Sequence, residues 1–291
     1  MYGYTERDYL SDFPYTDLAA ERRRADISLS GVDFKRETRG SFAWERIKIT
    51  SEEGAMSIGR PRGIYDTFSC ERMDLLALSD IDDAADELAR ELCYLFEYSG
   101  VYPERLLVAG LGNPDLTPDA IGPMAAGRVR ATMHIKEGDA MLFSSLECSE
   151  IAVITPGVTA KSGMDASVTV KALCDALSPD AVIAIDAIAS RSPKRLGRTI
   201  QVSSTGITPG TGIGGTREPL SEATLGVPVI AIGVPTVIDS RMFWHDASGG
   251  EGDTSLAREA MFVSPKEINE IVEVAAGIIG GGINQAFGFS Y

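Results

Sequence analysis

Short apolar runs recur through the second half of the chain, and each is followed by a loop and then, in several cases, by a helical pattern. Such nearly continuous runs are typical of strands that are covered on both faces of a sheet. The five predicted strands are 106–112, 151–157, 181–187, 199–204 and 227–233. A helix is predicted between the second and third, over about 163–177. This alternation is typical of βαβ units.

The amino-terminal part has a different pattern. Residues 44–50 and 63–70 alternate or are β-prone around a turn-rich stretch, which predicts a small antiparallel sheet. Asp80 is expected to cap a helix that continues to about Tyr98, and a closing helix is expected to begin near Ser264. The composition of residues 241–255 predicts a mobile loop.

These elements predict an α/β protein of three layers, with a mostly parallel, twisted sheet and helices on both faces. A β-rich extension at about residues 40–75 would be added to it. Residues 18–291 are expected to form one domain, because α/β folds often run to this length as a single unit. Residues 1 to about 26 lack a helical or strand period and are expected to be a poorly structured lead-in.

Composition narrows the classes of partner. The formal net charge of −15 argues against direct binding to nucleic acid or to anionic membranes, because both require a basic footprint. The amino terminus has no apolar segment of the kind found in secretory signals, and the four cysteines lack metal-binding spacing. We therefore expect a cytoplasmic protein without a membrane segment.

Two aspartates follow or end predicted strands. Asp119 lies in GLGNPDLTPDAIGP (110–123), where Thr117 is expected to cap a helix, and Asp186 interrupts the apolar run of VIAIDAIASRS (182–192). Because the carboxyl ends of parallel strands meet at one edge of a sheet, both carboxyl groups are expected at that edge, where α/β sheets bind ligands. A buried acid must be paired or neutralised, so two neighbouring acids would form a general acid and a general base.

Other interpretations of these residues stay open. Asp119 could simply complement a helix dipole, and the two acids could instead hold a metal ion together with a histidine. The available histidines, His134 and His245, lie away from the predicted strand ends. A dinucleotide loop is disfavoured because GLGNPD lacks the third glycine, and the glycine-rich segment 205–218 lacks the ending of a P-loop.

Several long motifs, in the same order along the chain, resemble those of the spore germination proteases, endopeptidases that degrade small acid-soluble spore proteins. The motifs are YTDLAAE (15–21), GLGNPDLTPDAIGP, PGVTAKSGMDAS (156–167), IAIDAIASRS (183–192), the segment 204–239 and SPKEINEIVEVAAGIIGGGIN (264–284). The resemblance covers most of the chain from Tyr15 onward. It implies a fold like that of hydrogenase maturation proteases.

The resemblance also implies roles for individual residues. Asp119 and Asp186 would be the catalytic pair of an aspartic or atypical endopeptidase, without a metal or other cofactor. Apart from the resemblance, Asn113 and the backbone of the glycine loop 205–216, which includes Gly210 and Gly212, are candidates for positioning the substrate or stabilising an oxyanion. The alternative is a metal-dependent maturation-type protease that uses the same acids as ligands.

The resemblance further implies a self-processing zymogen. Residues 1–17 would be its propeptide, cut between Asp17 and Leu18. Its substrates would be small acid-soluble, DNA-binding proteins of the spore, degraded during germination. The enzyme would be a cytoplasmic homotetramer in the developing spore and its core, without direct contact to nucleic acid.

Overall fold

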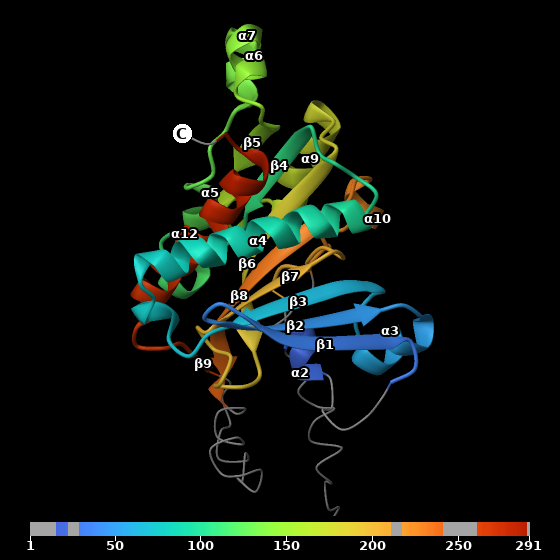
Figure 1. The fold of residues 1–291 in the computed structure, drawn as a ribbon, viewed down its shortest axis with the longest axis vertical. Coiled ribbons are helices and arrows are strands. Elements are labelled where there is room, and N and C mark those ends of the chain that lie inside the picture. The colour runs from blue at the N-terminus through green and yellow to red at the C-terminus, as the bar shows by residue number, and fades with distance from the viewer. Residues whose placement is uncertain (1–15, 23–28, 211–216, 241–260, 290–291) are drawn as a thin grey trace, which may run out of the picture.

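The computed structural model describes residues 16–22, 29–210, 217–240 and 261–289. These residues form one central sheet with the strand order β1-β2-β3-β7-β8-β6-β4-β5, and β9 pairs with β8 (Figure 1). The bounds of the strands are β1 Val32–Arg39, β2 Phe42–Ile49, β3 Gly63–Ser69, β4 Arg105–Gly110, β5 Glu150–Ile154, β6 Ala181–Ser190, β7 Thr199–Ser203, β8 Val229–Asp239 and β9 Phe262–Val263.

The α/β class predicted from the sequence is confirmed, and the sheet is mixed. β5, β4, β6 and β8 are parallel neighbours, as expected of βαβ units. β7 runs antiparallel to β8 and to β3, although the sequence placed it among the βαβ strands. Through β3 the amino-terminal strands continue the same sheet, so the β-rich extension is not a separate small sheet.

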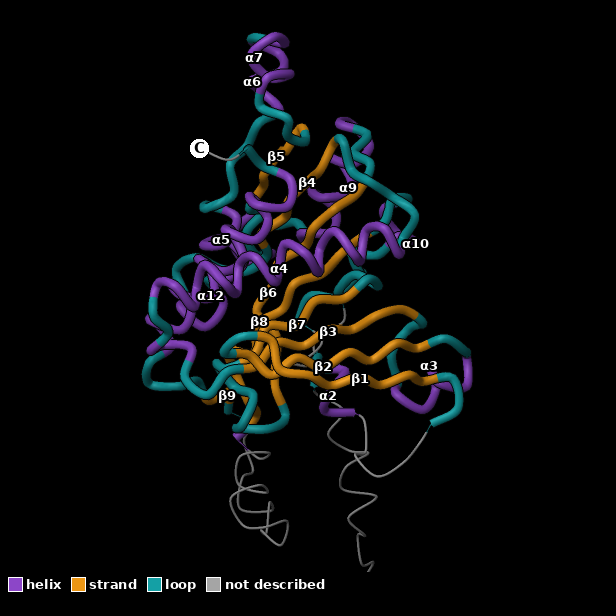
Figure 2. The backbone as a smooth tube through the Cα atoms, in the orientation of Figure 1, coloured by secondary structure: helices purple, strands orange, loops and turns teal. Residues whose placement is uncertain are grey.

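Helices cover both faces of the sheet (Figure 2). On one face α4 (Leu78–Tyr98), α12 (Ile268–Phe287) and α5 (Ile121–Ala126) enclose the largest apolar core. A Cβ atom at Gly282 of α12 would lie 2.9 Å from Leu88 of α4, so a glycine there allows the two helices to approach closely. On the opposite face α9 (Ala166–Leu177) and α10 (Glu222–Leu225) border a second core.

The remaining helices are short. α2 (Ala19–Arg22) and α3 (Glu52–Ile58) contribute to a third apolar cluster against β2 and β3. The others are α6 (Met133–Gly138), α7 (Ala140–Ser145), α8 (Thr159–Ser162), and the 3-10 turns η1 (Met73–Leu75) and η2 (Thr117–Asp119). None of the helices in the described part of the chain is long and apolar enough to cross a membrane.

Three helix starts differ from the sequence prediction. α4 begins at Leu78, and Asp80 lies in its first turn, where it accepts a hydrogen bond from Ser41. α12 begins at Ile268, because the hydroxyl of Ser264 donates to the carbonyl oxygen of Thr236 instead of capping the helix. Thr117 makes no capping bond and opens the turn η2, after which α5 follows.

The unequal lengths of the strands create room for a site. β4 last pairs with β6 at Gly110 and Ile185, whereas β6 and β8 continue together as far as Ser190 and Ile238. The loop after β4 therefore lies beside the protruding part of β6. Asp186 is the first residue of β6 beyond the end of β4, so it lies within the strand and not after it.

Candidate active site

The loop between β4 and η2 is folded so that it holds Asp119. The main-chain N–H of Asn113 lies 3.0 Å from the carbonyl oxygen of Asp119 and 2.9 Å from its Oδ2, and can donate to both. Gly112 has φ +113, and a Cβ atom there would lie 2.1 Å from the Asp119 carbonyl oxygen. Only glycine fits this close approach of the loop to the turn.

Asp186 is buried, with 5% of its surface exposed. It pairs in register with Gly233 of β8, between apolar strand residues. Burial raises the pKa of Asp186 well above its ordinary value, and the charges of Asp119 and then Asp17 raise it further. The N–H of Ala187 and the charge of Arg217 oppose this rise. Asp186 is therefore the group in the site most favoured to keep its proton.

Asp119 has a more polar setting. Burial raises its pKa too, but the Asn113 N–H and the positive charge of Arg217 both stabilise the carboxylate. The cavity thus holds a strongly desolvated acid, Asp186, and a second acid, Asp119, whose ionised form accepts a hydrogen bond. Two carboxyl groups with different environments of this kind are suited to separate acid and base roles.

Both carboxyl groups line one cavity of about 230 Å³, which we call the aspartate cavity. Its wall also includes Asp17, Gly210 and Arg217. Thr236 of β8 also lines it, and the Thr236 hydroxyl donates to the carbonyl oxygen of Pro118 over 2.6 Å. This bond joins the turn that carries Asp119 to the sheet.

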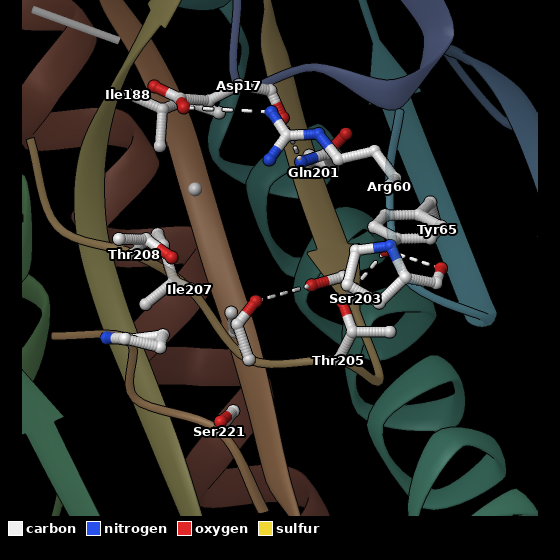
Figure 3. A pocket seen from close by; sticks show the side chains of 15 residues that line it. Asp17, Arg60, Tyr65, Ile188, Gln201, Ser203, Thr205, Ile207, Thr208 and Ser221 are labelled. Carbon is white, nitrogen blue, oxygen red and sulfur yellow. Dashed lines mark hydrogen bonds and ion pairs between the residues drawn. The ribbon is translucent and has the colours of Figure 1, made fainter. Parts of the chain in front are cut away.

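A second cavity of about 260 Å³ is also lined by Asp17, and we call it the Gln201 cavity (Figure 3). Asp17 and Ile188 line both cavities. In Figure 3 Asp17 lies close to Arg60 and Gln201 at one end of this cavity, and Ser221 lies at the other. The side-chain amide of Gln201 donates to the carbonyl oxygen of Asp17 over 3.1 Å. The segment around Asp17 thus runs between two hollows.

Most of the chain matches a known protein family. The germination protease family model matches residues 15–248. The chain belongs to the germination protease family. A germination protease of Clostridium perfringens is 34% identical over 93% of this chain and 94% of its own length, and one of Caldanaerobacter subterraneus is 34% identical over 93% of each. A germination protease of Oceanobacillus iheyensis is 38% identical over 78% of this chain and 61% of its own.

Among solved structures, a NiFe hydrogenase maturation protease, HycI from Thermococcus kodakarensis, aligns with a TM-score of 0.38 and 17% identity. The alignment covers 67% of this chain and 99% of that one. Membership of the germination proteases makes the chain a peptidase, a hydrolase of peptide bonds, that acts in spores.

The sequence-predicted residues of this germination protease have different positions in the site. Asp119, Asp186 and Gly210 line the aspartate cavity together. Asn113 is not among the lining residues, because its side-chain oxygen accepts from the N–H of Asp115 and its own N–H binds Asp119. It acts on Asp119 rather than facing the cavity. Gly212 lies outside the described residues.

The candidate metal ligands do not converge in the described part of the chain. His134 lies in α6, and Lys136 of the same helix pairs with Glu150, the first residue of β5. His134 is therefore near the amino ends of the parallel strands, whereas the two aspartates lie at their carboxyl ends. His245 and the whole predicted loop 241–255 lie outside the described residues. Among residues that the structure describes, no group of three histidine, cysteine or acidic side chains is arranged to hold a metal ion.

Sequence reasoning missed Arg217, Thr236 and Gln201 as parts of the site. Arg217 lies near the end of the glycine-rich segment 205–218, and a cation in a segment expected to border the site is a signal for a counter-charge to the two acids. Gln201 and Thr236 are polar residues in otherwise apolar strands, which is the signal that marked Asp186. The sequence motif assigns Asp17 only to the expected cleavage position, and in the structure Asp17 lines both cavities.

Proposed function

We propose that this member of the family degrades small acid-soluble, DNA-binding spore proteins during germination, and that Asp119 and Asp186 are its catalytic pair. The observation that carries the proposal is that both carboxyl groups line one cavity beyond the end of β4, with Asp186 only 5% exposed. Like charges in such a place cannot both be ionised without a large cost, so the pair holds one proton.

The pKa of Asp186 is raised by burial and by Asp119, so the shared proton is favoured on Asp186. The negative charge is then favoured on Asp119. Asp119 then takes a proton from a water molecule whose oxygen attacks the peptide carbonyl carbon. Asp186 donates its proton to the carbonyl oxygen. When the C–N bond breaks, the proton on Asp119 passes to the leaving amine and the hydroxyl proton returns to Asp186, so the pair is restored.

The other residues of the wall have supporting roles in this proposal. Arg217 balances the charge of the pair, and the backbone at Gly210 borders the space where the substrate would lie. Asn113 positions Asp119 through its N–H. The glycine at position 212 is proposed, with Gly210, to position the substrate.

The test is replacement of each aspartate by asparagine, with cleavage of a purified small acid-soluble spore protein as the assay. Asp119→Asn and Asp186→Asn are each expected to lower kcat by roughly 100-fold or more, the usual contribution of a positioned acid or base. Asp115→Asn is the matched control, because Asp115 lies in the same loop but is exposed and pairs with Lys161. Near-normal activity in either catalytic variant would contradict the proposal, as would full loss of activity on chelation of metal ions.

We also propose that residues 1–17 are a propeptide removed by self-cleavage between Asp17 and Leu18. The support is that Asp17 lines the aspartate cavity together with Asp119 and Asp186. Intact-mass measurement under activating conditions should find a product that lacks residues 1–17, and Asp186→Asn should not yield it. Homotetramer formation and residence in the spore core belong to the same proposal, and analytical ultracentrifugation checks the first.

A further inference from the structure

β8 contains one residue more than its neighbour β6 over the stretch that borders the aspartate cavity. Ile188 of β6 pairs with Pro235, and the next residue, Ala189, pairs with Val237, so Thr236 is an extra residue of β8. Such an insertion is a β-bulge. Bulges are rare between parallel strands and frequent next to active sites, where they redirect a side chain. The position of Thr236 is therefore a feature to explain.

Two hydrogen bonds hold the bulge in its shape. The carbonyl oxygen of Pro235 accepts from the N–H of Gly197 at 2.7 Å, and proline has no N–H of its own that the bulge could leave unpaired. The carbonyl oxygen of Thr236 accepts from the hydroxyl of Ser264 at 2.7 Å. Both carbonyl groups thus have partners outside the pairing of β6 with β8, and the bulge has a defined backbone.

The bulge carries a polar side chain into an apolar strand. Every other side chain of VIAIGVPTVI (229–238) is apolar, and Thr236 is 0% exposed. A buried hydroxyl is costly unless it is hydrogen-bonded. The Thr236 hydroxyl donates to the carbonyl oxygen of Pro118 over 2.6 Å, which is the length of a well-formed bond. Because threonine is branched at Cβ and stiff about χ1, the backbone of the bulge sets the direction of this bond.

The acceptor of this bond belongs to the peptide group that joins Pro118 to Asp119 in η2. The N–H of the same peptide group donates to the carbonyl oxygen of Leu116 over 2.7 Å, which is a bond within the turn. The Thr236 bond instead ties this peptide group to β8, and β8 pairs with the strand that carries Asp186. One hydroxyl therefore links the backbone at Asp119 to the part of the sheet that fixes Asp186.

Resting on the proposed pair of Asp119 and Asp186, we infer that Thr236 is a positioning residue for the hydrolysis of the peptide bond. The β-bulge brings its hydroxyl to Pro118, and this bond holds Asp119 at the distance from Asp186 that the attacking water and the substrate carbonyl require. Thr236 acts through Asp119, and none of its own bonds changes in the reaction.

The test compares two variants that differ in the hydroxyl. Thr236→Val keeps the shape of the side chain and removes the hydroxyl, whereas Thr236→Ser keeps the hydroxyl. With a purified small acid-soluble spore protein as substrate, Thr236→Val is expected to lower kcat by roughly 10- to 100-fold and to change KM by less than about twofold, because it displaces a catalytic group and leaves binding intact. Thr236→Ser should recover most of the lost kcat. A wild-type kcat in Thr236→Val, or an equal loss in Thr236→Ser, would overturn the inference.

Thr132→Val is the matched control for a loss of stability alone. Thr132 is also 0% exposed, and its hydroxyl donates to the carbonyl oxygen of Ser149 and accepts from the N–H of Ile151. Both valine variants leave buried main-chain groups without a partner, so both should unfold at lower urea concentrations than the wild type. Only Thr236→Val should lower kcat, measured where circular dichroism shows both variants folded. An equal loss of kcat in the control would reject a positioning role.

A double variant tests whether Thr236 acts through Asp119. Groups that act as a unit are not additive, so the addition of Thr236→Val to Asp119→Asn should change the residual kcat by less than about twofold. A further loss as large as that of the single Thr236→Val variant would show that Thr236 acts independently of Asp119 and would overturn the inference.

Hydrogen exchange separates this inference from the proposed function, because it needs no activity. The N–H of Asp119 should exchange several-fold faster or more in Thr236→Val than in the wild type, and at the wild-type rate in Thr132→Val. Unchanged exchange in Thr236→Val, together with an inactive Asp119→Asn variant, rejects the anchor and keeps the catalytic pair. Near-normal activity of Asp119→Asn rejects the catalytic pair whatever the exchange rates are.

Discussion

The main-chain N–H of Leu111 donates to the carbonyl oxygen of Ile185 over 2.8 Å. Leu111 is the first residue after β4, and Ile185 directly precedes Asp186. The bond therefore continues the pairing of β4 with β6 by one step and fixes the loop that leads to Asp119 against the strand that carries Asp186. The spacing of the two aspartates thus depends on the backbone geometry of this loop.

Gly112→Ala should displace Asp119. The added methyl group would lie 2.1 Å from the Asp119 carbonyl oxygen, and the residue has φ +113. A displacement of about 1 Å in a catalytic group lowers activity by roughly 100-fold. The matched control is Gly226→Ala, which also has positive φ (+80) but no atom within 4 Å of the added Cβ.

The control is expected to lose roughly 1–2 kcal/mol of stability from backbone strain alone and to keep its activity. Cleavage assays at a temperature where both variants are folded, as judged by circular dichroism, make the comparison. Equal activity of the two variants would show that the loop does not position Asp119.

The pH dependence of kcat should be bell-shaped. The acid limb belongs to the group that must be ionised, Asp119, and its midpoint should lie above pH 3.8 because burial raises that pKa. The alkaline limb belongs to Asp186, whose pKa is raised by burial and by Asp119. Arg217→Gln removes the positive charge that lowers the pKa of both acids, so it should move both limbs to higher pH.

Both shifts are measured with a separate peptide substrate. An alkaline limb that stays in place in Arg217→Gln would mean that Asp186 does not set it. Asp115→Asn, in the exposed pair with Lys161, should leave both limbs unchanged.

Asp186→Asn should stabilise the fold at neutral pH while it abolishes activity. The pKa of Asp186 is higher in the folded chain than its ordinary value. The folded state therefore binds more protons, and its stability falls as the pH rises from about 4 to the folded pKa. Asparagine removes this dependence, so the variant's gain in free energy of unfolding should grow with pH over that window. Urea titrations at pH 4 and pH 7 compare the two chains, and an equal difference at both pH values would contradict the assignment.

The positions of the two aspartates could be anticipated because their signal is local. An acid that interrupts an apolar run is rare, and the parallel pairing of β4 with β6 follows from the βαβ pattern. For both aspartates to line one cavity, β4 must then only end before β6 does. The sequence could not reveal that β6 continues to Ser190, because its end depends on pairing with β8.

The antiparallel direction of β7 was equally beyond a local pattern. Residues 199–203 have the same apolar character as a parallel strand, and their direction is set by β3 on one side and β8 on the other. The contacts of Gln201 and Glu21 join residues that are 182 and 170 positions apart in the chain. Only the folded sheet brings these residues together.

Glu91 is a buried acid that lies outside the aspartate cavity. Glu91 of α4 is 3% exposed and shares Arg46 with Asp66, which is fully buried and makes two 2.8 Å bonds to that guanidinium. Burial and Asp66 raise the pKa of Glu91 to about 8, although Arg46 and Arg39 oppose the rise. Glu91 is thus expected to be protonated at neutral pH and to share its hydrogen bond with Asp66.

Because the folded pKa of Glu91 exceeds the ordinary 4.5, the stability that it contributes is full below that pH and is lost as the pH rises to about 8. Glu91→Gln imitates the protonated form at every pH. The variant should match the wild type near pH 4.5 and become more stable than it by up to about 1.4 kcal/mol for each further pH unit. Urea titrations at pH 5, 7 and 8.5 measure the difference. Glu87→Gln, on the same helix but about a quarter exposed, is the control. A Glu91→Gln chain that is less stable than wild type at pH 8.5 would show that Glu91 is ionised and held by the two arginines.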